Sequence, residues 1–363
     1  MTPGTRAPLY FAVLLGAIAV LWLLYPFVAP DTPQTTLRPA TEFARSTHGP
    51  YAFIFWLTAV VFVAVEAGLV YALFRFRRRT DELPSQTHGN TALELSWTLA
   101  TTALVIVMFI PSCQQVRYAQ SKPPTDALRI EVTGHQWWWD AYYPEEDVIT
   151  ANEIHVPVGR TVALDLTSAD VIHSFWIPRL GGKRDMVPGR RQILWFTPES
   201  PGVYEGQCAE YCGTSHTFMA MQIVAETPEG FRAWIEQQKA ASPPSTDPKA
   251  QLGQVAFLTT AGCVICHSPL QNDRLVRGML GPNLRKLGTR QNLGAGMFGN
   301  TPEALFRWIK DPQSVKPGAK MDIPVAECTG PGTPKPCCRR AGIGNCLSDE
   351  TVEQLVAYLQ SLK

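Results

Sequence analysis

Three apolar stretches near the N-terminus constrain the fold of this 363-residue sequence more than any other feature. The first, residues 9–29, carries no charged side chain. The second, residues 51–74, carries one acid, Glu66, and the third, residues 91–111, carries Glu94 near its start. Each stretch has about the 20 residues that a helix needs to cross a bilayer. The sequence therefore predicts a protein that is attached to a membrane through its N-terminal third.

Residues 50–112 are expected to form a transmembrane helical hairpin, and residues 1–30 to form a separate hydrophobic segment. That first segment is either a signal anchor or a signal peptide. The absence of a small-x-small pattern before Pro30 favours an anchor that is not cleaved. The loop of the hairpin is basic, and positive residues stay on the cytoplasmic side; they are Arg75, Arg77, Arg78 and Arg79. Everything after Pro111 is therefore expected outside the cytoplasm, where disulfides are allowed.

The exported part changes pattern twice along the chain. Residues 120–238 hold short β-type runs between Pro/Gly turns, which favour a β-sandwich or Greek-key barrel closed by a helix at residues 228–238. The predicted strands are 128–132, 136–143, 153–156, 161–167, 192–196, 202–207 and 219–224. A Ser/Pro-rich linker follows at residues 239–250. Residues 251–363 then show helical patterns at 249–260, 301–310 and 348–362, with Thr301 and Ser348 as expected N-caps. The formal net charge of +1 gives no reason to expect a nucleic-acid partner.

A C-x-x-C-H motif lies at the start of this last region, at residues 263–267. In such a motif the thiols of Cys263 and Cys266 can add to the vinyl groups of a haem, and His267 can bind the iron. A redox dithiol or a chance match is the alternative. Methionine is the usual second axial ligand in electron-transfer haems. Met321 is the favoured candidate because it lies in a turn-rich loop between two helices, followed by Met297 and then Met279.

A second cluster of metal-binding residue types spans residues 207–219, "QCAEYCGTSHTFM", with His173 upstream in "VIHSFWIP". A plain disulfide would explain the two cysteines but not the histidine or the methionine. Structural zinc has no use for a methionine. Thiolate, imidazole and thioether together select copper, and two thiolates can bridge two copper ions. The expected ligands are His173, Cys208, the Glu210 carbonyl, Cys212, His216 and Met219.

These motifs, with "GHQWWWD" at 134–140 and "KRDMVPGR" at 183–190, resemble subunit II of cytochrome c oxidase fused to a class I cytochrome c domain, as in caa-type oxidases. The resemblance implies a multidomain fold. It consists of N-terminal transmembrane helices, an all-β cupredoxin-like Greek-key domain and an all-α class I cytochrome c domain. It places the chain in a bacterial plasma membrane, as a multi-pass protein with both soluble domains on the periplasmic side. Gly281–Leu284 is similar to the cytochrome c segment whose proline carbonyl holds the proximal histidine ring.

The resemblance also implies a function and roles for single residues. The chain would be the electron-input subunit of a haem–copper terminal oxidase, passing electrons from haem c through Trp137 to the binuclear copper site (CuA) and on to subunit I. There oxygen is reduced to water, coupled to proton pumping. Glu210 would also reach a magnesium ion shared with subunit I, Glu94 would lie at the mouth of a proton channel, and Asp185 would face subunit I. The implied partners are subunits I and III, membrane lipid, and a donor such as a cytochrome c or a quinol–cytochrome c reductase.

Two features depart from the family pattern, namely the additional N-terminal segment and four cysteines after the Met321 loop. These four are expected to form disulfides of unknown pairing, with a metal site as the alternative; they are Cys328, Cys337, Cys338 and Cys346. Two other functions fit the motifs, namely the electron-input subunit of a CuA-containing nitric oxide reductase and a non-enzymatic exported copper carrier or sensor. A nitrous oxide reductase is excluded, because only seven histidines are present and three of these are already assigned.

Overall fold

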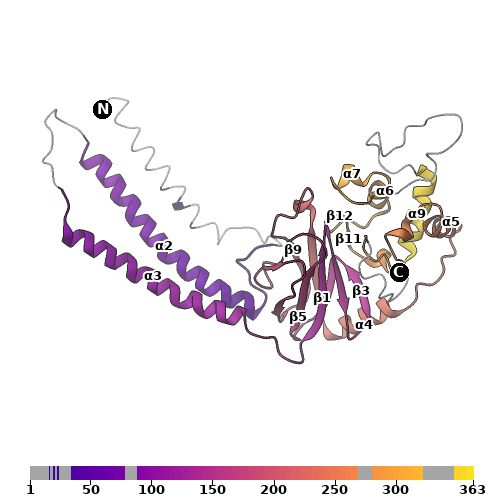
Figure 1. Cartoon of the computed structure of the whole chain (residues 1–363), viewed down its shortest axis with the longest axis horizontal. Helices are drawn as coiled ribbons and strands as arrows, with labels where there is room; N and C mark the ends of the chain where they lie inside the picture. The colour runs from indigo at the N-terminus through magenta and orange to yellow at the C-terminus, as the bar shows by residue number, and fades with distance from the viewer. Residues whose placement is uncertain are drawn as a thin grey trace. The chain divides into compact units, whose positions relative to one another are not determined.

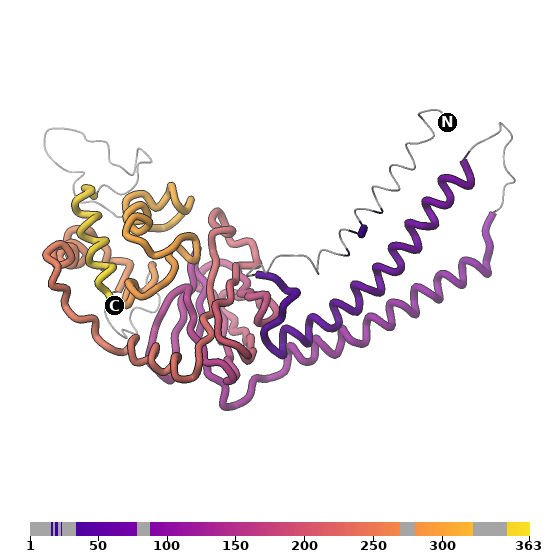
Figure 2. The backbone as a smooth tube through the Cα atoms, turned by 180° about the vertical axis from the view of Figure 1, so that it is seen from behind, coloured from indigo at the N-terminus to yellow at the C-terminus, as the bar shows by residue number. Residues whose placement is uncertain are grey.

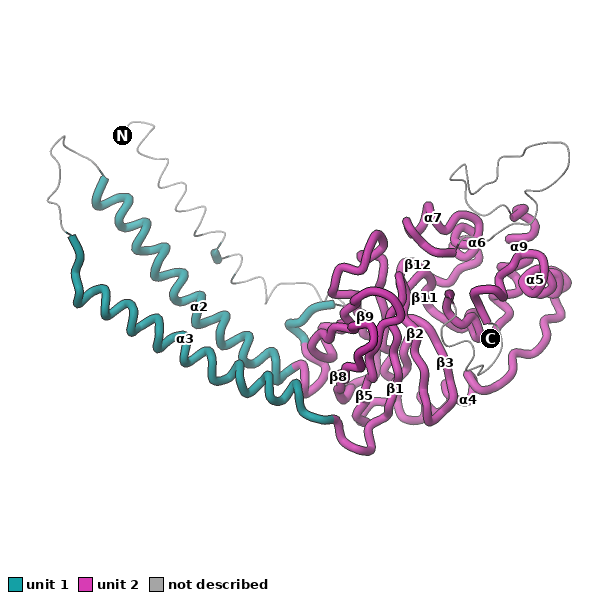
Figure 3. Tube along the Cα trace, in the orientation of Figure 1, with its two compact units in different colours: residues 1–38, 45–122 teal, residues 39–44, 123–363 magenta. Residues whose placement is uncertain are grey.

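The computed structural model describes residues 34–77, 88–268, 280–321 and 347–363, together with residues 16, 19, 20 and 23 (Figure 1). The chain divides into two compact units (Figure 3). Residues 1–38 and 45–122 form the first unit, and residues 39–44 and 123–363 form the second. Most of the predicted N-terminal segment lies outside the described residues.

The first unit contains two long apolar helices, α2 (Glu42–Arg75) and α3 (Thr91–Ala119). Both are long and apolar enough to cross a membrane, as the sequence predicts. They lie side by side in both views of the backbone (Figures 1 and 2), and the Gln115 side-chain amide donates a hydrogen bond to Thr47 Oγ1 at 2.8 Å. At the start of α3 the Asn90 side chain accepts from the Leu93 N–H at 3.1 Å. This bond satisfies one of the otherwise unpaired amides at a helix N-terminus.

The second unit begins with two five-stranded sheets, arranged β3-β2-β1-β5-β8 and β4-β10-β9-β6-β7. The first sheet consists of β1 (Leu128–His135), β2 (Trp138–Tyr143), β3 (Val148–Ala151), β5 (Val162–Ser168) and β8 (Gln192–Phe196). The second consists of β4 (Glu153–Pro157), β6 (His173–Trp176), β7 (Arg184–Met186), β9 (Gly202–Cys208) and β10 (Ala220–Glu226). Pairing is antiparallel except between β1 and β5 and between β4 and β10.

One hydrophobic core joins the two sheets. Alternate residues of β1 are buried, as expected for a strand with one face packed and one exposed. Large side chains from both sheets meet in this core, among them Trp139 and Phe196 from the first sheet and Phe175 from the second, all with exposed fractions of 1% or less. Helix α4 (Pro228–Lys239) packs Phe231 and Trp234 against the same core. The predicted β-sheet domain is thus confirmed, and its packing leaves the β9–β10 loop at one end of the sheets.

The C-terminal portion of the second unit is mainly helical, with α5 (Pro248–Leu258), α6 (Pro302–Lys310), α7 (Pro312–Val315) and α9 (Asp349–Ser361). Short 3-10 turns lie at Cys263–Ile265 and Leu287–Thr289, and a small β11–β12 hairpin (Asn292–Leu293 and Phe298–Gly299) follows the second turn. The predicted caps are present: the Thr301 hydroxyl accepts from Ala304 N, and the Ser348 hydroxyl accepts from Thr351 N. Helices α5 and α9 pack closely at Gly253, where an added Cβ would lie 1.9 Å from the Gln354 carbonyl oxygen.

Candidate metal centre and adjoining cavity

All six predicted copper ligands lie in one cluster at the end of the two sheets. Strand β6 begins with His173, and its neighbour β9 ends with Cys208, so strand pairing brings these two residues together. The loop from β9 to β10 then returns the other ligands to the same place. Cys208 Sγ lies 3.8 Å from Cys212 Sγ, 3.9 Å from His173 Nδ1 and 3.3 Å from the Glu210 carbonyl oxygen.

Cys212 completes the cluster on its other side. Its Sγ lies 3.5 Å from His216 Nδ1 and 3.8 Å from Met219 Sδ. Cys208, Cys212 and Met219 are all at most 4% exposed, and both cysteines are free thiols. The two sulfurs therefore lie close together in a buried place, and no disulfide joins them.

The electrostatics of the cluster favour one ionised sulfur even without a metal. A hydrogen bond from Cys212, supported by His173, lowers the pKa of Cys208. The same hydrogen bond holds the proton on Cys212 and raises the pKa of that thiol. A metal ion needs deprotonated thiolates as ligands. A site that already holds a thiolate next to a second buried thiol is suited to a soft cation.

Asp170 orients the His173 ring. The Asp170 carboxylate lies 2.8 Å from His173 Nε2 and also accepts hydrogen bonds from the backbone amides of Gln136 and Val171. Burial tends to raise the pKa of Asp170, but these hydrogen bonds outweigh it and bring the pKa to about 2. Burial tends to lower the pKa of His173, and its bonds to Asp170 and Cys208 reverse the shift upward. The ring thus presents Nδ1 to the cluster, as in carboxylate–histidine–metal triads.

The donor set fits copper better than zinc. The two thiols, two imidazoles, thioether and carbonyl are more donors than a tetrahedral zinc site uses, and the thioether is a soft ligand. Of the residues that the structure describes, His173, Cys208 and Cys212 form the group of His, Cys and acidic residues with ligand atoms within 4.8 Å of one another. The residues present would therefore hold a copper pair.

Trp137 connects this cluster to the C-terminal portion. Its indole Nε1 donates to the Cys212 carbonyl at 3.1 Å, and the Gln136 side chain donates to the same oxygen at 2.8 Å. The three successive tryptophans have different surroundings. Trp137 is 8% exposed, Trp138 stacks on His135 with ring centroids 4.1 Å apart, and Trp139 is fully buried in the core. Of the three, Trp138 alone is half-buried, and the other two are buried.

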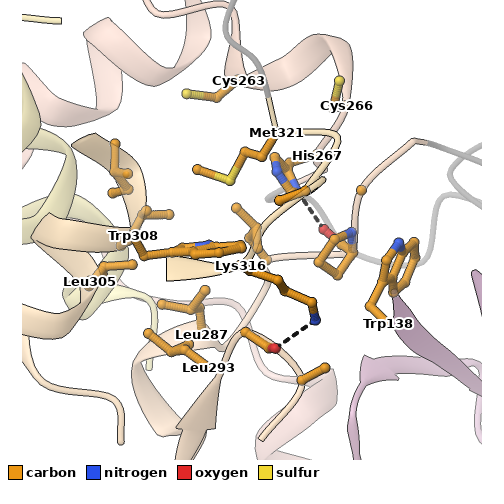
Figure 4. Close-up of a pocket in the computed structure, with 18 of the residues that line it drawn as sticks. Trp138, Cys263, Cys266, His267, Leu287, Leu293, Leu305, Trp308, Lys316 and Met321 are labelled. Atoms are coloured by element: carbon orange, nitrogen blue, oxygen red, sulfur yellow. Dashed lines mark hydrogen bonds between the residues drawn. The ribbon is translucent and has the colours of Figure 1, made fainter. Parts of the chain in front are cut away.

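A cavity is lined by Trp137 and by residues of the C-terminal portion, and Figure 4 shows it in close-up. It encloses about 1330 Å³ of space free of protein atoms, part of which is open to solvent. The proposed haem residues Cys263, Cys266, His267 and Met321 line it, together with Trp137 and Trp138. Leu287, Leu293, Leu305 and Trp308 add apolar walls (Figure 4). A flat apolar cofactor would therefore be covered on several sides, with one tryptophan between it and the sulfur cluster.

His267 is held in the way that the resemblance of Gly281–Leu284 to a cytochrome c segment implies. Its Nδ1 lies 2.8 Å from the Pro282 carbonyl oxygen, so the other ring nitrogen is left for an iron. Burial lowers the pKa of His267, which keeps the imidazole neutral and able to bind a metal. Of the candidate axial methionines, Met321 lines the cavity and Met279 lies outside the described residues. The residues present fit a haem attached through a C-x-x-C-H motif.

Comparison with known proteins decides the family. The family described as the transmembrane domain of cytochrome c oxidase subunit II matches residues 40–114, and the one described as its periplasmic domain matches residues 147–227. "Cytochrome c oxidase subunit 2" of Alkalihalophilus pseudofirmus is 34% identical over 319 residues, covering 85% of this chain and 86% of that protein. The chain belongs to the cytochrome c oxidase subunit II family. The corresponding protein of Bacillus subtilis is 32% identical over 348 residues, 91% of this chain and 92% of that protein.

A solved structure gives a similar result at the sequence level. The periplasmic domain of subunit II of cytochrome oxidase from Bradyrhizobium japonicum shares 35% identity, with a TM-score of 0.31, over 32% of this chain and 96% of that one. The resemblance to cytochrome c oxidase subunit II is confirmed by the two family matches and the curated relatives. As a member of this family, the chain is a subunit of a cytochrome-c oxidase with membrane-anchoring helices and a domain on the outer side. The cytochrome c character of residues 251–363 stays a prediction.

Other residues to which the family resemblance assigns roles are Glu94, Asp185 and the side chain of Glu210. Glu94 lies in the first unit, where its carboxylate accepts the Asn90 N–H at 3.0 Å near the start of α3. Asp185 is exposed on β7, and the Glu210 side chain belongs to an exposed residue, although its carbonyl faces Cys208. The four cysteines of the predicted disulfides lie outside the described residues; they are Cys328, Cys337, Cys338 and Cys346.

Three residues around the candidate site were not found from the sequence. Asp170 stands three positions before His173, and this spacing was a usable local signal. Gln136 lies within the "GHQWWWD" motif, but nothing in the motif indicates its bond to the Cys212 carbonyl. Lys316, which reaches the Trp137 carbonyl from 179 positions away, has no sequence signal.

Proposed function

We propose that the chain is the electron-input subunit of a haem–copper terminal oxidase and carries both a haem c and a binuclear copper site. The observation that carries this proposal is the position of Trp137. It donates a hydrogen bond to the carbonyl of one copper-ligand candidate, Cys212, and it lines the cavity of the C-x-x-C-H motif. The alignment with the Alkalihalophilus protein adds support. It covers 85% of this chain, and an alignment of that length must continue past the two sheets into the residues after 251.

Each residue set has a defined task in this proposal. When bound, the haem and the copper pair each take up and release one electron at a time. His173, Cys208, Cys212, His216, Met219 and the Glu210 carbonyl would hold the copper pair. Cys263 and Cys266 would hold the haem covalently. His267 and Met321 would bind its iron.

The polypeptide around the two cofactors would hold their ligands in place and exclude water. The copper-ligand candidates are held by paired strands and a short loop, so their positions change little when charge changes. Burial keeps water from the sulfurs, and Asp170 fixes the His173 ring. Trp137 supplies a short covalent and hydrogen-bonded route between the cavity and Cys212.

The same proposal covers partners and location. The chain would deliver electrons to subunit I, where oxygen is reduced to water with proton pumping, and subunit III would complete the complex. Glu210 would share a magnesium ion with subunit I, Asp185 would contact that subunit, and Glu94 would lie at a proton-channel mouth. The soluble portions would face the periplasm of a bacterial plasma membrane. The donor would be a cytochrome c or a quinol–cytochrome c reductase.

Metal and haem analysis of the full chain in detergent tests this function. We expect a copper pair per covalently bound haem, with an EPR signal delocalised over both copper ions. Replacing Cys212 by Ser should abolish that signal and leave the haem spectrum intact. The double replacement C263S/C266S should remove the covalent haem and leave the copper signal. Cys113→Ser, the same change at a free thiol in α3, should alter neither. A chain that binds only zinc, or no haem, would refute the proposal.

A further inference from the structure

Lys316 is a lysine buried in the wall of the cavity. It follows α7 and is 3% exposed. Its Nζ donates to the Trp137 carbonyl at 2.6 Å and to the Gly294 carbonyl at 2.9 Å, and Figure 4 shows the second of these bonds. Trp137 lies between β1 and β2, whereas Gly294 lies in the turn of the β11–β12 hairpin. One ammonium group thus joins the sheets, the hairpin and the loop that leads to Met321.

An ammonium group in this position is energetically unfavourable unless something requires it. Burial lowers the pKa of Lys316 to about 7, and the nearby Cys212 offsets only part of this shift. Buried charges are expected to be paired, since moving a cation out of water carries a large cost. Two carbonyl oxygens offset only part of this cost. An apolar side chain of similar length would fill the same space without the cost of moving a cation out of water. Stability alone therefore does not account for a lysine here.

The surrounding loop packs directly on Trp137. A Cβ added at Gly318 would lie 3.1 Å from the Trp137 ring, and the Ser215 hydroxyl donates to the Pro317 carbonyl. Ser215 belongs to the β9–β10 loop, which holds the copper-ligand candidates. Residues 316–318 therefore contact both the tryptophan and the loop of the sulfur cluster, and Lys316 is the member of this segment that is anchored by charge.

We infer that Lys316 is a positioning residue for electron transfer: its ammonium fixes the Met321 loop and the cavity against Trp137, so that haem and copper are held at one separation. This inference rests on the proposed function. Electron transfer slows steeply with distance, so a small loss of this contact would lower the rate while both cofactors remain bound. The nearby Lys320 provides the contrast. Its side chain is 53% exposed, and its Nζ contacts the Gln136 side chain at 3.0 Å and Asp170 at 3.9 Å.

The two lysines predict different responses to salt. Exposed ion pairs contribute little and are screened at high ionic strength, whereas buried contacts are screened much less. If Lys316 holds the two portions together, the rate of haem-to-copper electron transfer should be nearly independent of salt. If exposed charges such as Lys320 hold them, raising the salt concentration should slow the transfer.

The test compares Lys316→Met with Lys320→Met in the full chain carrying haem and copper. The haem is reduced by a light-activated reductant, and the rate of copper reduction is followed optically. Hydrogen exchange of residues 136–138 and 292–296 reports the contact independently. K316M should keep both cofactors, slow the transfer by about tenfold or more, and speed exchange in both segments, as expected when a hydrogen-bonded charge is lost. K320M and 0.5 M salt should change neither.

The outcomes separate this inference from the proposed function. A K316M chain with both cofactors, the wild-type rate and unchanged exchange overturns the inference and leaves the proposed function standing. A wild-type chain that lacks copper or haem overturns both. Should K316M lose a cofactor, Lys316→Gln, which keeps a donor to one carbonyl, replaces it in the same measurement. An intermediate rate for K316Q supports the inference, and the wild-type rate refutes it.

Discussion

Gly134 lies directly against the ring of His173, and a single added methyl group should displace this copper-ligand candidate. A Cβ at position 134 would lie 2.9 Å from His173 Cδ2 and 3.1 Å from its Cγ. Non-bonded carbon atoms prefer separations of about 3.5–4.0 Å. Gly134→Ala must therefore push the ring away by roughly 0.6–1 Å, if the strand itself does not yield.

The ring has little freedom to move. His173 is fully buried, is bound to Asp170 at 2.8 Å and meets the Trp139 ring edge-on at 5.8 Å. Overpacking in such a place costs about 1–3 kcal/mol. Metal–ligand distances tolerate only about 0.2 Å. Since about 1.4 kcal/mol corresponds to a factor of ten, we expect copper affinity to fall by ~10–100-fold.

Competition with a copper chelator measures this loss in the full chain in detergent, with the haem spectrum as the internal reference. Gly299→Ala is the matched control, because nothing lies within 4 Å of a Cβ there and its backbone is not left-handed. The control should retain wild-type copper affinity. If Gly134→Ala holds copper with unchanged affinity and an unchanged EPR signal, the ring is not held by its packing and the reasoning is refuted.

Two further substitutions test the packing and the charge of the second unit. Gly253→Ala should separate α5 from α9, because the methyl would lie 1.9 Å from the Gln354 carbonyl. We expect the free energy of unfolding to fall by about 3 kcal/mol, measured by thermal unfolding. An unchanged Tm would contradict the close packing. Burial raises the pKa of Glu153 from 4.5, despite the hydrogen bond from Asn292 N at 2.7 Å. The folded chain therefore keeps a proton that the unfolded chain releases, and wild-type stability should fall as pH rises above about 4.5. In urea, the free energy of unfolding of Glu153→Gln should exceed that of wild type at pH 8, and the difference should be smaller at pH 5. An equal difference at both pH values would contradict a raised pKa of Glu153.

Local chemistry was readable from the sequence. Strand β8 was predicted with the observed bounds, and α6 and α9 begin where the expected caps Thr301 and Ser348 stand. The copper-ligand candidates were found because donor type and spacing within one loop limit the possible metals. These features depend on neighbours a few residues apart, which a sequence displays directly.

Features that depend on distant pairing were missed. Strands β3, β6 and β7 have three or four residues each, too few for an alternating pattern, and their conformation is set by the strands beside them. The burial of Trp137 depends on a loop almost two hundred positions later in the chain. Such contacts exist only after the second unit has folded.

The three tryptophans that follow Gln136 differ in their contacts only because of their positions. Trp137 donates a hydrogen bond to the Cys212 carbonyl, Trp138 lines the cavity, and Trp139 fills the core. Each of the three places has different surroundings, so a shift of the segment by one position would give each indole the surroundings of its neighbour. A one-residue insertion before Trp137 would move each indole one place along the chain. The inserted side chain would then face the Cys212 carbonyl in place of an indole, and the link between the sulfur cluster and the cavity would be lost.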